Sequence, residues 1–146
     1  MPNSLIVYKD KTLWMGDSFL EIIIYYLVPL IKNSLCNATI LESHKEWLLN
    51  YHDDMEYYLQ GLSAGGIDFE LEDIAADNYK LTFFKNILNE VKVILDSKGT
   101  ELSIKELNLI EDMKLGEKNY WEEPVKIEKI ISFIEKLYSM LESESV

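Results

Sequence analysis

Apolar residues recur at helical spacing along most of this chain. Between residues 81 and 95 they are separated alternately by three and four positions, at Leu81, Phe84, Leu88, Val91 and Leu95. This spacing places them on one face of a helix, and four other segments show a similar pattern. Each apolar face must be buried against another element. We therefore expect a mainly α protein in which residues 1–146 form a single helical domain, a compact bundle of about five amphipathic helices.

Three of the expected helices begin with a capping box, which is a serine or threonine followed three positions later by glutamate. The pairs are Ser18 and Glu21, Thr39 and Glu42, and Ser103 and Glu106. In such a box the two side chains satisfy free backbone N–H groups of the first turn. The last helix should begin differently, with Pro124 in its first turn, where the missing N–H would have no partner in any case.

Proline and glycine predict where the helices are interrupted or end. Pro29 should kink or split the first helix near Val28, because proline removes a backbone hydrogen bond. Gly61 should end the second helix near Gln60, and Gly99 should end the third, both in the left-handed conformation. The second helix carries an apolar stripe that should face inward, formed by Leu41, His44, Leu48, Tyr51, Met55, Tyr58 and Leu62.

Two segments have the alternating pattern of extended chain. Residues 5–8 and 12–15 are largely apolar and flank the polar run Lys9-Asp10-Lys11, which predicts a short N-terminal β-hairpin beside the helices. Such a hairpin needs a larger surface to pack against. Residues 67–72 also alternate between apolar and acidic, and we expect a short extended piece or an irregular helix there.

The acidic residues are concentrated in one part of the sequence. The 34 residues from Glu46 to Tyr79 have no lysine or arginine and a net charge of −9, out of −12 for the whole chain. The nine acids are Glu46, Asp53, Asp54, Glu56, Asp68, Glu70, Glu72, Asp73 and Asp77. A surface of one sign steers oppositely charged partners toward it. Whether residues 53–56 and 68–77 form one surface depends on how the glycine-rich turn between them folds.

The basic residues argue against nucleic acid as a partner. All 14 are lysine and none is arginine, the side chain best suited to recognise phosphates and bases with two parallel hydrogen bonds. With a sequence pI of about 4.5, the chain would be repelled by the phosphate backbone. We therefore expect no binding to nucleic acid.

The sequence predicts a soluble cytoplasmic protein. Its one cysteine, Cys36, cannot form an internal disulfide, and we expect a buried thiol. The first residues lack the basic region and cleavage site of a secretory signal. The most apolar run, residues 22–31, is half as long as the roughly 20 residues needed to span a bilayer, so no membrane association is expected.

One short motif resembles a catalytic element, but its surroundings do not fit. Gly61-Leu62-Ser63-Ala64-Gly65 matches the G-x-S-x-G pattern of a hydrolase nucleophile turn. That turn follows a strand, whereas the residues before Gly61 continue a helix, and both histidines precede Ser63 rather than follow it. We expect a glycine-rich turn and no enzyme activity.

Two further motifs suggest metal ligands and are also incomplete. His52-Asp53 resembles the doublet of metal-dependent phosphohydrolases, which need more ligands from other helices. The alternating acids at Asp68, Glu70 and Glu72 resemble the start of a calcium loop. That loop requires a glycine at the position of Asp73. We expect no metal site and no cofactor.

The chain resembles bacterial immunity proteins, which protect cells from polymorphic toxins and from toxins of contact-dependent growth inhibition. The resemblance is one of size, acidity and helical pattern over the whole chain, without a diagnostic motif. It implies a cytoplasmic binding protein that neutralises a basic partner by blocking the active site or groove of a nuclease-type toxin. The residues expected to bind the partner are Asp53, Asp54, Tyr57, Asp68, Phe69, Glu70, Glu72, Asp73 and Asp77.

Two other hypotheses remain open at this point. The chain could be a structural or regulatory helical module that self-associates through an apolar surface, with its charge serving solubility alone. It could also be a small enzyme that uses the carboxylates around His52, which would require tightly bound metal. The sequence does not predict the oligomeric state.

Overall fold

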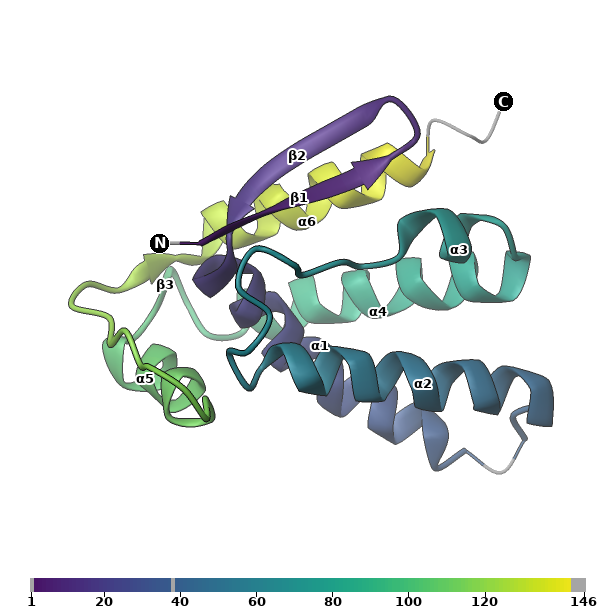
Figure 1. Ribbon diagram of the computed structural model, residues 1–146, viewed down its shortest axis with the longest axis horizontal. Coiled ribbons are helices and arrows are strands. Elements are labelled where there is room, and N and C mark those ends of the chain that lie inside the picture. The colour runs from purple at the N-terminus through teal and green to yellow at the C-terminus, as the bar shows by residue number, and fades with distance from the viewer. Residues whose placement is uncertain (1, 38, 143–146) are drawn as a thin grey trace.

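The computed structural model describes residues 2–37 and 39–142, and in this part of the chain it contains six helices and two pairs of antiparallel strands (Figure 1). The helices are α1 (Asp17–Leu35), α2 (Glu42–Tyr58), α3 (Leu71–Ala75), α4 (Asn78–Asp96), α5 (Ile104–Asp112) and α6 (Ile127–Glu142). The strands are β1 (Asn3–Tyr8), β2 (Lys11–Gly16), β3 (Glu101–Leu102) and β4 (Val125–Lys126). The predicted mainly α fold with an N-terminal hairpin is confirmed.

Helix α1 is the centre of the hydrophobic core. It packs against α2, α4 and α5, while α6 packs on the other side of α4 and lies under the hairpin (Figure 1). Six of its apolar side chains have no exposed surface, namely Leu20, Ile22, Ile23, Ile24, Leu27 and Ile31. Among the described residues, α1 alone is long and apolar enough to cross a membrane, a test that buried core helices of this kind also pass.

One of the three predicted capping boxes forms in part, because its serine caps the helix while the Glu106 carboxylate accepts a hydrogen bond from Lys98. The Ser103 hydroxyl accepts a hydrogen bond of 3.1 Å from the backbone N–H of Glu106 at the start of α5. The box at Ser18 is wrong, because β2 leads directly into α1, and the N–H of Asp17 bonds to the carbonyl of Pro2. The box at Thr39 is also wrong, since its hydroxyl donates to Asn37 instead (2.8 Å).

The predicted helix ends are confirmed at the glycines, whereas the split at Pro29 and the helix start at Pro124 are wrong. Gly61 and Gly99 have φ values of 74° and 102°, in the left-handed region. Helix α1 continues through Pro29 without a break. Pro124 precedes strand β4 rather than starting α6, because Val125 and Lys126 pair with β3. Cys36 is exposed, contrary to the expected buried thiol, because it caps the end of α1.

The inward stripe of α2 is shorter than the sequence predicts. Leu48, Tyr51 and Met55 are buried, as expected. Leu41 and Leu62 are 63% and 51% exposed, because both residues lie outside the helix, where helical spacing no longer determines direction.

The chain between α2 and α3 runs extended, and its side chains alternate between core and solvent. Ile67 and Phe69 are buried, whereas Asp68 is exposed. The N–H of Ile67 donates to the Ser4 hydroxyl of β1 at 3.0 Å, which ties this segment to the hairpin. Helix α3 begins at Leu71, so the segment contains both of the expected elements, an extended piece followed by a short helix.

Candidate functional site

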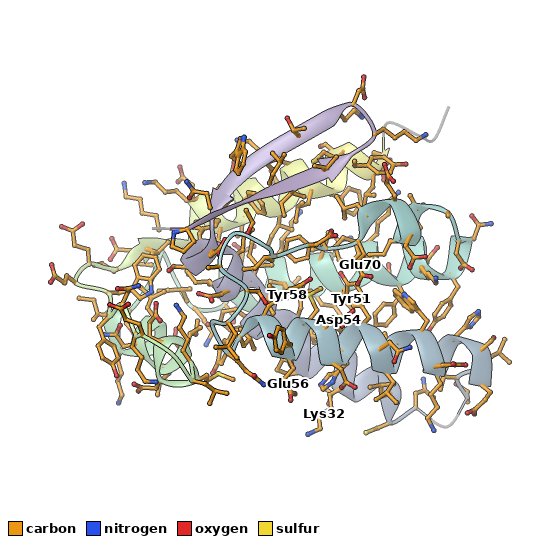
Figure 2. All side chains as sticks on the ribbon, in the orientation of Figure 1. Lys32, Tyr51, Asp54, Glu56, Tyr58 and Glu70 are labelled. Carbon is orange, nitrogen blue, oxygen red and sulfur yellow. The ribbon has the colours of Figure 1, made fainter. Side chains whose placement is uncertain are left out.

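A groove of about 420 Å³ brings acidic residues from two distant parts of the sequence together. We call it the acidic groove, and its lining residues are Ser43, Glu46, Trp47, Asn50, Tyr51, Asp54, Glu70, Asp73 and Lys80. Helix α2 forms one side, and the segment leading into α3, with the start of α4, forms the other. Figure 2 shows Asp54 and Glu70 between these elements, and Glu56 on the opposite side of α2.

Asp54 and Glu70 approach each other across the acidic groove. Both carboxyl groups line the groove, and the negative charge of Asp54 acts directly on that of Glu70. Burial raises the pKa of Glu70, and the negative charges of Asp54 and Asp68 raise it further. None of the ion pairs among residues 2–37 and 39–142 involves either Asp54 or Glu70. This part of the groove therefore has negative charge without a paired lysine.

The backbone of Glu70 adopts an unfavourable conformation for its residue type. Its φ is 57°, in the left-handed region that favours glycine, and it is the residue immediately before α3. Its N–H donates to the Asp68 carboxylate at 2.7 Å, which fixes the turn. Strained conformations of this kind occur often at binding and catalytic sites, where the surrounding structure holds them in place.

One lysine enters the acidic groove from α4. The Lys80 ammonium lies 3.2 Å and 3.3 Å from the two carboxylate oxygens of Asp73. It also lies 5.4 Å from the centre of the Trp47 ring, a distance at which a cation is attracted to an aromatic face. The groove thus combines two features that bind ammonium groups, a carboxylate and an indole ring.

Aromatic side chains stiffen the floor of the groove and the region beside it. Tyr51 is buried, and its hydroxyl donates to the carbonyl of Phe69 at 3.0 Å, so α2 is fastened to the extended segment directly beneath the acids. Burial raises the pKa of Tyr51 well above its usual value, so it remains a neutral donor. The Trp47 and Tyr51 rings lie 5.3 Å apart, and next to them Tyr79 stacks on His44.

Phe69 was expected to contact a partner, and the structure shows that this is wrong. Its side chain is 0% exposed and packs near Phe84 in the core. The extended segment alternates, so Ile67 and Phe69 point inward together while Asp68 points outward. The alternation of apolar and acidic residues over 67–72 in the sequence already indicated that Phe69 would face inward.

The other residues that the sequence analysis expected to bind the partner lie outside the groove and apart from one another. Tyr57 is 47% exposed on α2. Asp53 lies 3.2 Å from His52, whose other ring nitrogen is 3.5 Å from Glu56. Glu72, in the first turn of α3, accepts a hydrogen bond from the backbone of Lys9 in the hairpin turn at 3.4 Å. The predicted surface is therefore divided, and only Asp54, Glu70 and Asp73 line the groove.

Asp77 serves the start of helix α4. Its carboxylate accepts hydrogen bonds from the backbone N–H groups of Tyr79 and Lys80, at 2.8 Å and 3.1 Å. The bond from Lys80 is the main reason that the pKa of Asp77 lies below its usual value. Such a cap stabilises the first turn of the helix, because it satisfies backbone N–H groups that would otherwise lack a partner. Its role as a helix cap therefore accounts for an aspartate at position 77 without any binding partner.

The sequence did not single out several residues of the groove. Ser43, Trp47, Asn50, Tyr51 and Lys80 line it without having been predicted as site residues. Glu46, Asn50 and Asp54 recur every four positions on α2, and that spacing on one helical face was the available signal. Lys80 could be recognised only once α3 had placed Asp73 beside it.

The motifs with a catalytic or metal-binding appearance remain incomplete in the structure. Ser63 lines a cavity between α1 and α5 whose lining contains no histidine. In the described part of the chain, no three His, Cys, Asp or Glu side chains are arranged to hold a metal ion. The groove itself combines carboxylates with an indole ring, an arrangement that can bind cationic groups.

No protein-family model, no curated protein and no solved structure matches this chain.

Proposed function

We propose that the protein is a binding protein whose acidic groove accepts a basic segment of another protein and thereby neutralises it. The observation that supports this most strongly is the Asp54–Glu70 pair, in which two carboxyl groups face each other without a paired lysine. Bringing a lysine or arginine of a partner between them would remove this repulsion. Complementary charge would also speed the encounter of the two proteins.

The partner that fits best is a nuclease-type toxin, and the protein would then be its immunity protein. Such a toxin displays lysine and arginine side chains that bind the phosphate backbone. Carboxylates held rigidly on an inhibitor can bind the same lysines and arginines in place of the phosphates. The groove has a rigid floor, because Tyr51 and Phe69 are buried and joined by a hydrogen bond. The protein acts in the cytoplasm under this proposal, where its free cysteine stays reduced.

Two variants with the same change in charge separate the groove from general acidity. Asp54→Asn with Glu70→Gln removes the two facing carboxylates of the groove. Asp53→Asn with Glu56→Gln removes two carboxylates around His52 on the same helix, outside the groove. Each tagged protein is used to capture partners from the cells that produce it, at low and high salt, and the captured proteins are identified by mass spectrometry.

The proposal expects one stoichiometric basic protein that binds the wild type and the Asp53/Glu56 variant. The Asp54/Glu70 variant should bind it about tenfold more weakly or worse, since a partner cation would lose both of its facing carboxylates. Purified partner is then assayed for nuclease activity with and without this protein. Equal capture by both variants would rule out the groove as the interface.

A second candidate function, self-association, has a specific observation in its favour. The outer face of the hairpin exposes Leu5, Val7 and Trp14, and Leu5 is paired directly with Trp14 across the two strands. Analytical ultracentrifugation of the wild type and of Trp14→Ser tests this function. A dimer that is insensitive to salt and lost in Trp14→Ser would favour it, whereas a monomer at all concentrations would exclude it.

A further inference from the structure

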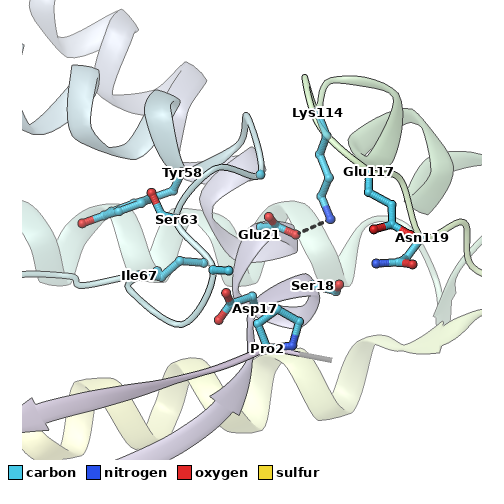
Figure 3. A pocket seen from close by; sticks show the side chains of 12 residues that line it. Pro2, Asp17, Ser18, Glu21, Tyr58, Ser63, Ile67, Lys114, Glu117 and Asn119 are labelled. Carbon is cyan, nitrogen blue, oxygen red and sulfur yellow. Dashed lines mark ion pairs between the residues drawn. The ribbon is translucent and has the colours of Figure 1, made fainter.

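A second, separate cavity lies between the start of α1, the glycine-rich turn after α2, and the loop after α5 (Figure 3). We call it the α1–α5 cavity. Its volume is about 230 Å³, and it is lined by Pro2, Asp17, Ser18, Glu21, Tyr58, Gly61, Ser63, Ala64, Ile67, Lys114, Glu117 and Asn119. None of these residues lines the acidic groove. We propose that the α1–α5 cavity binds a small organic cation that carries a primary ammonium group.

Charged side chains line this cavity although they are almost completely buried. Asp17, Glu21 and Lys114 are 7%, 4% and 8% exposed. Burying an ionised group costs several kcal/mol unless it is paired and hydrogen-bonded, so a core built for stability alone uses apolar residues instead. A small number of fixed polar and charged groups in a cavity can orient a polar ligand.

The buried charges are not balanced. The Lys114 ammonium lies 3.0 Å from Glu21 and 2.6 Å from Glu111, so one cation serves two carboxylates. Asp17 and Glu117 add negative charge to the same lining. Burial raises the pKa of Glu21, Lys114 lowers it in part, and the charges of Glu111 and Asp17 raise it again. A second ammonium in the cavity would relieve this excess, whereas an anion would increase it.

The groups that would hold the ammonium are fixed in place. Asp17 accepts hydrogen bonds from the Ser4 hydroxyl at 2.6 Å and from the N–H of Gly65 at 2.7 Å. Each carboxylate oxygen retains a further lone pair for a ligand. The hydroxyls of Ser18 and Ser63 border the same space (Figure 3).

The dimensions and the apolar lining limit the size of the cation. The volume of about 230 Å³ corresponds to roughly eight water molecules at their volume in the liquid. Tyr58 and Ile67 form an apolar wall opposite the charges. The cavity therefore suits a short aliphatic amine, with its ammonium toward Glu21 and Asp17 and its carbon atoms toward Tyr58.

The test is a titration of the full-length protein followed by proton–nitrogen correlation spectroscopy. The probes are ethylammonium, acetate and ethanol, which have similar size and differ in charge. The backbone amide of Gly65 reports on the cavity because it donates to Asp17. We expect ethylammonium to shift this amide in a saturable manner, and acetate and ethanol to leave it unchanged.

Matched variants assign the binding to the cavity. Ser18→Leu fills the space, and Ser132→Leu makes the same chemical change at an exposed residue of α6 that lines neither the cavity nor the acidic groove. Ethylammonium should bind roughly tenfold more weakly to Ser18→Leu and with unchanged affinity to Ser132→Leu. If Ser18→Leu does not fold, Asn119→Asp provides the test, because an added carboxylate at this exposed lining residue should tighten binding about two- to fivefold.

Three results would overturn the proposal. The first is an amide of Gly65 that no probe shifts, and the second is a shift that acetate or ethanol produces equally. The third is an ethylammonium affinity that neither Ser18→Leu lowers nor Asn119→Asp raises. None of these results would bear on the acidic groove, because the two sites have no lining residue in common.

Discussion

The carboxyl group of Glu70 lies across the acidic groove from that of Asp54, so two groups that repel each other when ionised are held together by the fold. Glu70 is also held with a positive φ of 57°. Both features disfavour the folded state and bring no compensating ion pair. A site for a cation has such properties, because the bound partner supplies the positive charge that the two carboxyl groups lack in the free protein.

Glu70→Gln should therefore make the protein more stable and a poorer binder. The amide keeps the size of the side chain and removes its repulsion with Asp54, Asp68 and Asp73. We expect a gain of about 0.5 kcal/mol in the free energy of unfolding at neutral pH, measured with urea, and weaker capture of the basic partner. A loss of stability would mean that the Glu70 carboxylate has a favourable partner, which contradicts the proposed site.

The stability of the protein should depend on pH through Glu70 in a direction opposite to that of an ion-paired carboxylate. Its pKa in the folded protein is raised above the ordinary value of 4.5, so the folded state binds this proton more tightly than the unfolded state does. The resulting stabilisation is complete below pH 4.5 and is lost as the pH rises from 4.5 through the folded pKa. Binding of a cation should change in the opposite way and strengthen over the same interval.

Comparison with Glu70→Gln isolates this effect from that of Glu21, whose pKa is also raised. Urea unfolding of both proteins should be measured at several pH values above and below 4.5. The difference in stability between variant and wild type should grow in favour of Glu70→Gln as the pH rises. A difference that is constant with pH would show that Glu70 has the same pKa in both states.

Lys114 should be essential for the junction between α1 and α5. It pairs with Glu21 of α1 and Glu111 of α5, all three being buried. Burial alone would lower the pKa of Lys114, but its hydrogen bonds to the two glutamates raise it, so it remains charged. Lys114→Met leaves two buried carboxylates without a cation, and we expect a loss of about 3–5 kcal/mol in urea unfolding.

The same change should be largely tolerated when the carboxylates are removed with it. The triple variant Lys114→Met, Glu21→Gln and Glu111→Gln removes all three buried charges of this ion-paired group. It should recover most of the lost stability, because uncharged buried groups avoid the desolvation of an unpaired ion. A triple variant as unstable as Lys114→Met would show that the aliphatic stem and packing of Lys114 matter more than its charge.

Phe69 and Tyr57 were both predicted as contact residues, and they should behave differently when truncated. Phe69→Ala removes a side chain with no exposed surface and should cost about 3–5 kcal/mol of stability. Tyr57→Ala removes a side chain that is 47% exposed and should change stability by about 0.5 kcal/mol or less. Thermal unfolding followed by circular dichroism measures both. Similar losses for the two variants would contradict the placement of these residues.

Local patterns in the sequence predicted the elements that depend on neighbouring residues. The apolar spacing around Leu88 predicted α4, and the capping box at Ser103 predicted the start of α5, because both depend on residues within one or two turns. The boxes at Ser18 and Thr39 did not form. At Ser18 the reason is non-local. There, Asp17 bonds to Pro2 and Ser4 of the hairpin, which sets the start of α1.

The acidic groove could not be predicted from the sequence, because its two sides are brought together by the glycine-rich turn between α2 and α3, whose position depends on contacts with distant residues. That turn has Gly61 and Gly65 with φ of 74° each, and it is fastened to the hairpin by the bond from Ile67 to Ser4. The acidity of the region was visible, but the pairing of Asp54 with Glu70 required these contacts. The buried triad of Lys114 was missed for the same reason, since Glu21 lies on a distant helix.

The most direct test of the central claim compares how the partner binds to the two charge-matched variants. Wild type, Asp54→Asn/Glu70→Gln and Asp53→Asn/Glu56→Gln are titrated by calorimetry against the basic protein that the wild type captures. The account predicts that the first variant loses about tenfold or more in affinity, while the second stays within about twofold of the wild type. Equal losses in the two variants, or no loss in either, would contradict the assignment of the acidic groove as the binding site.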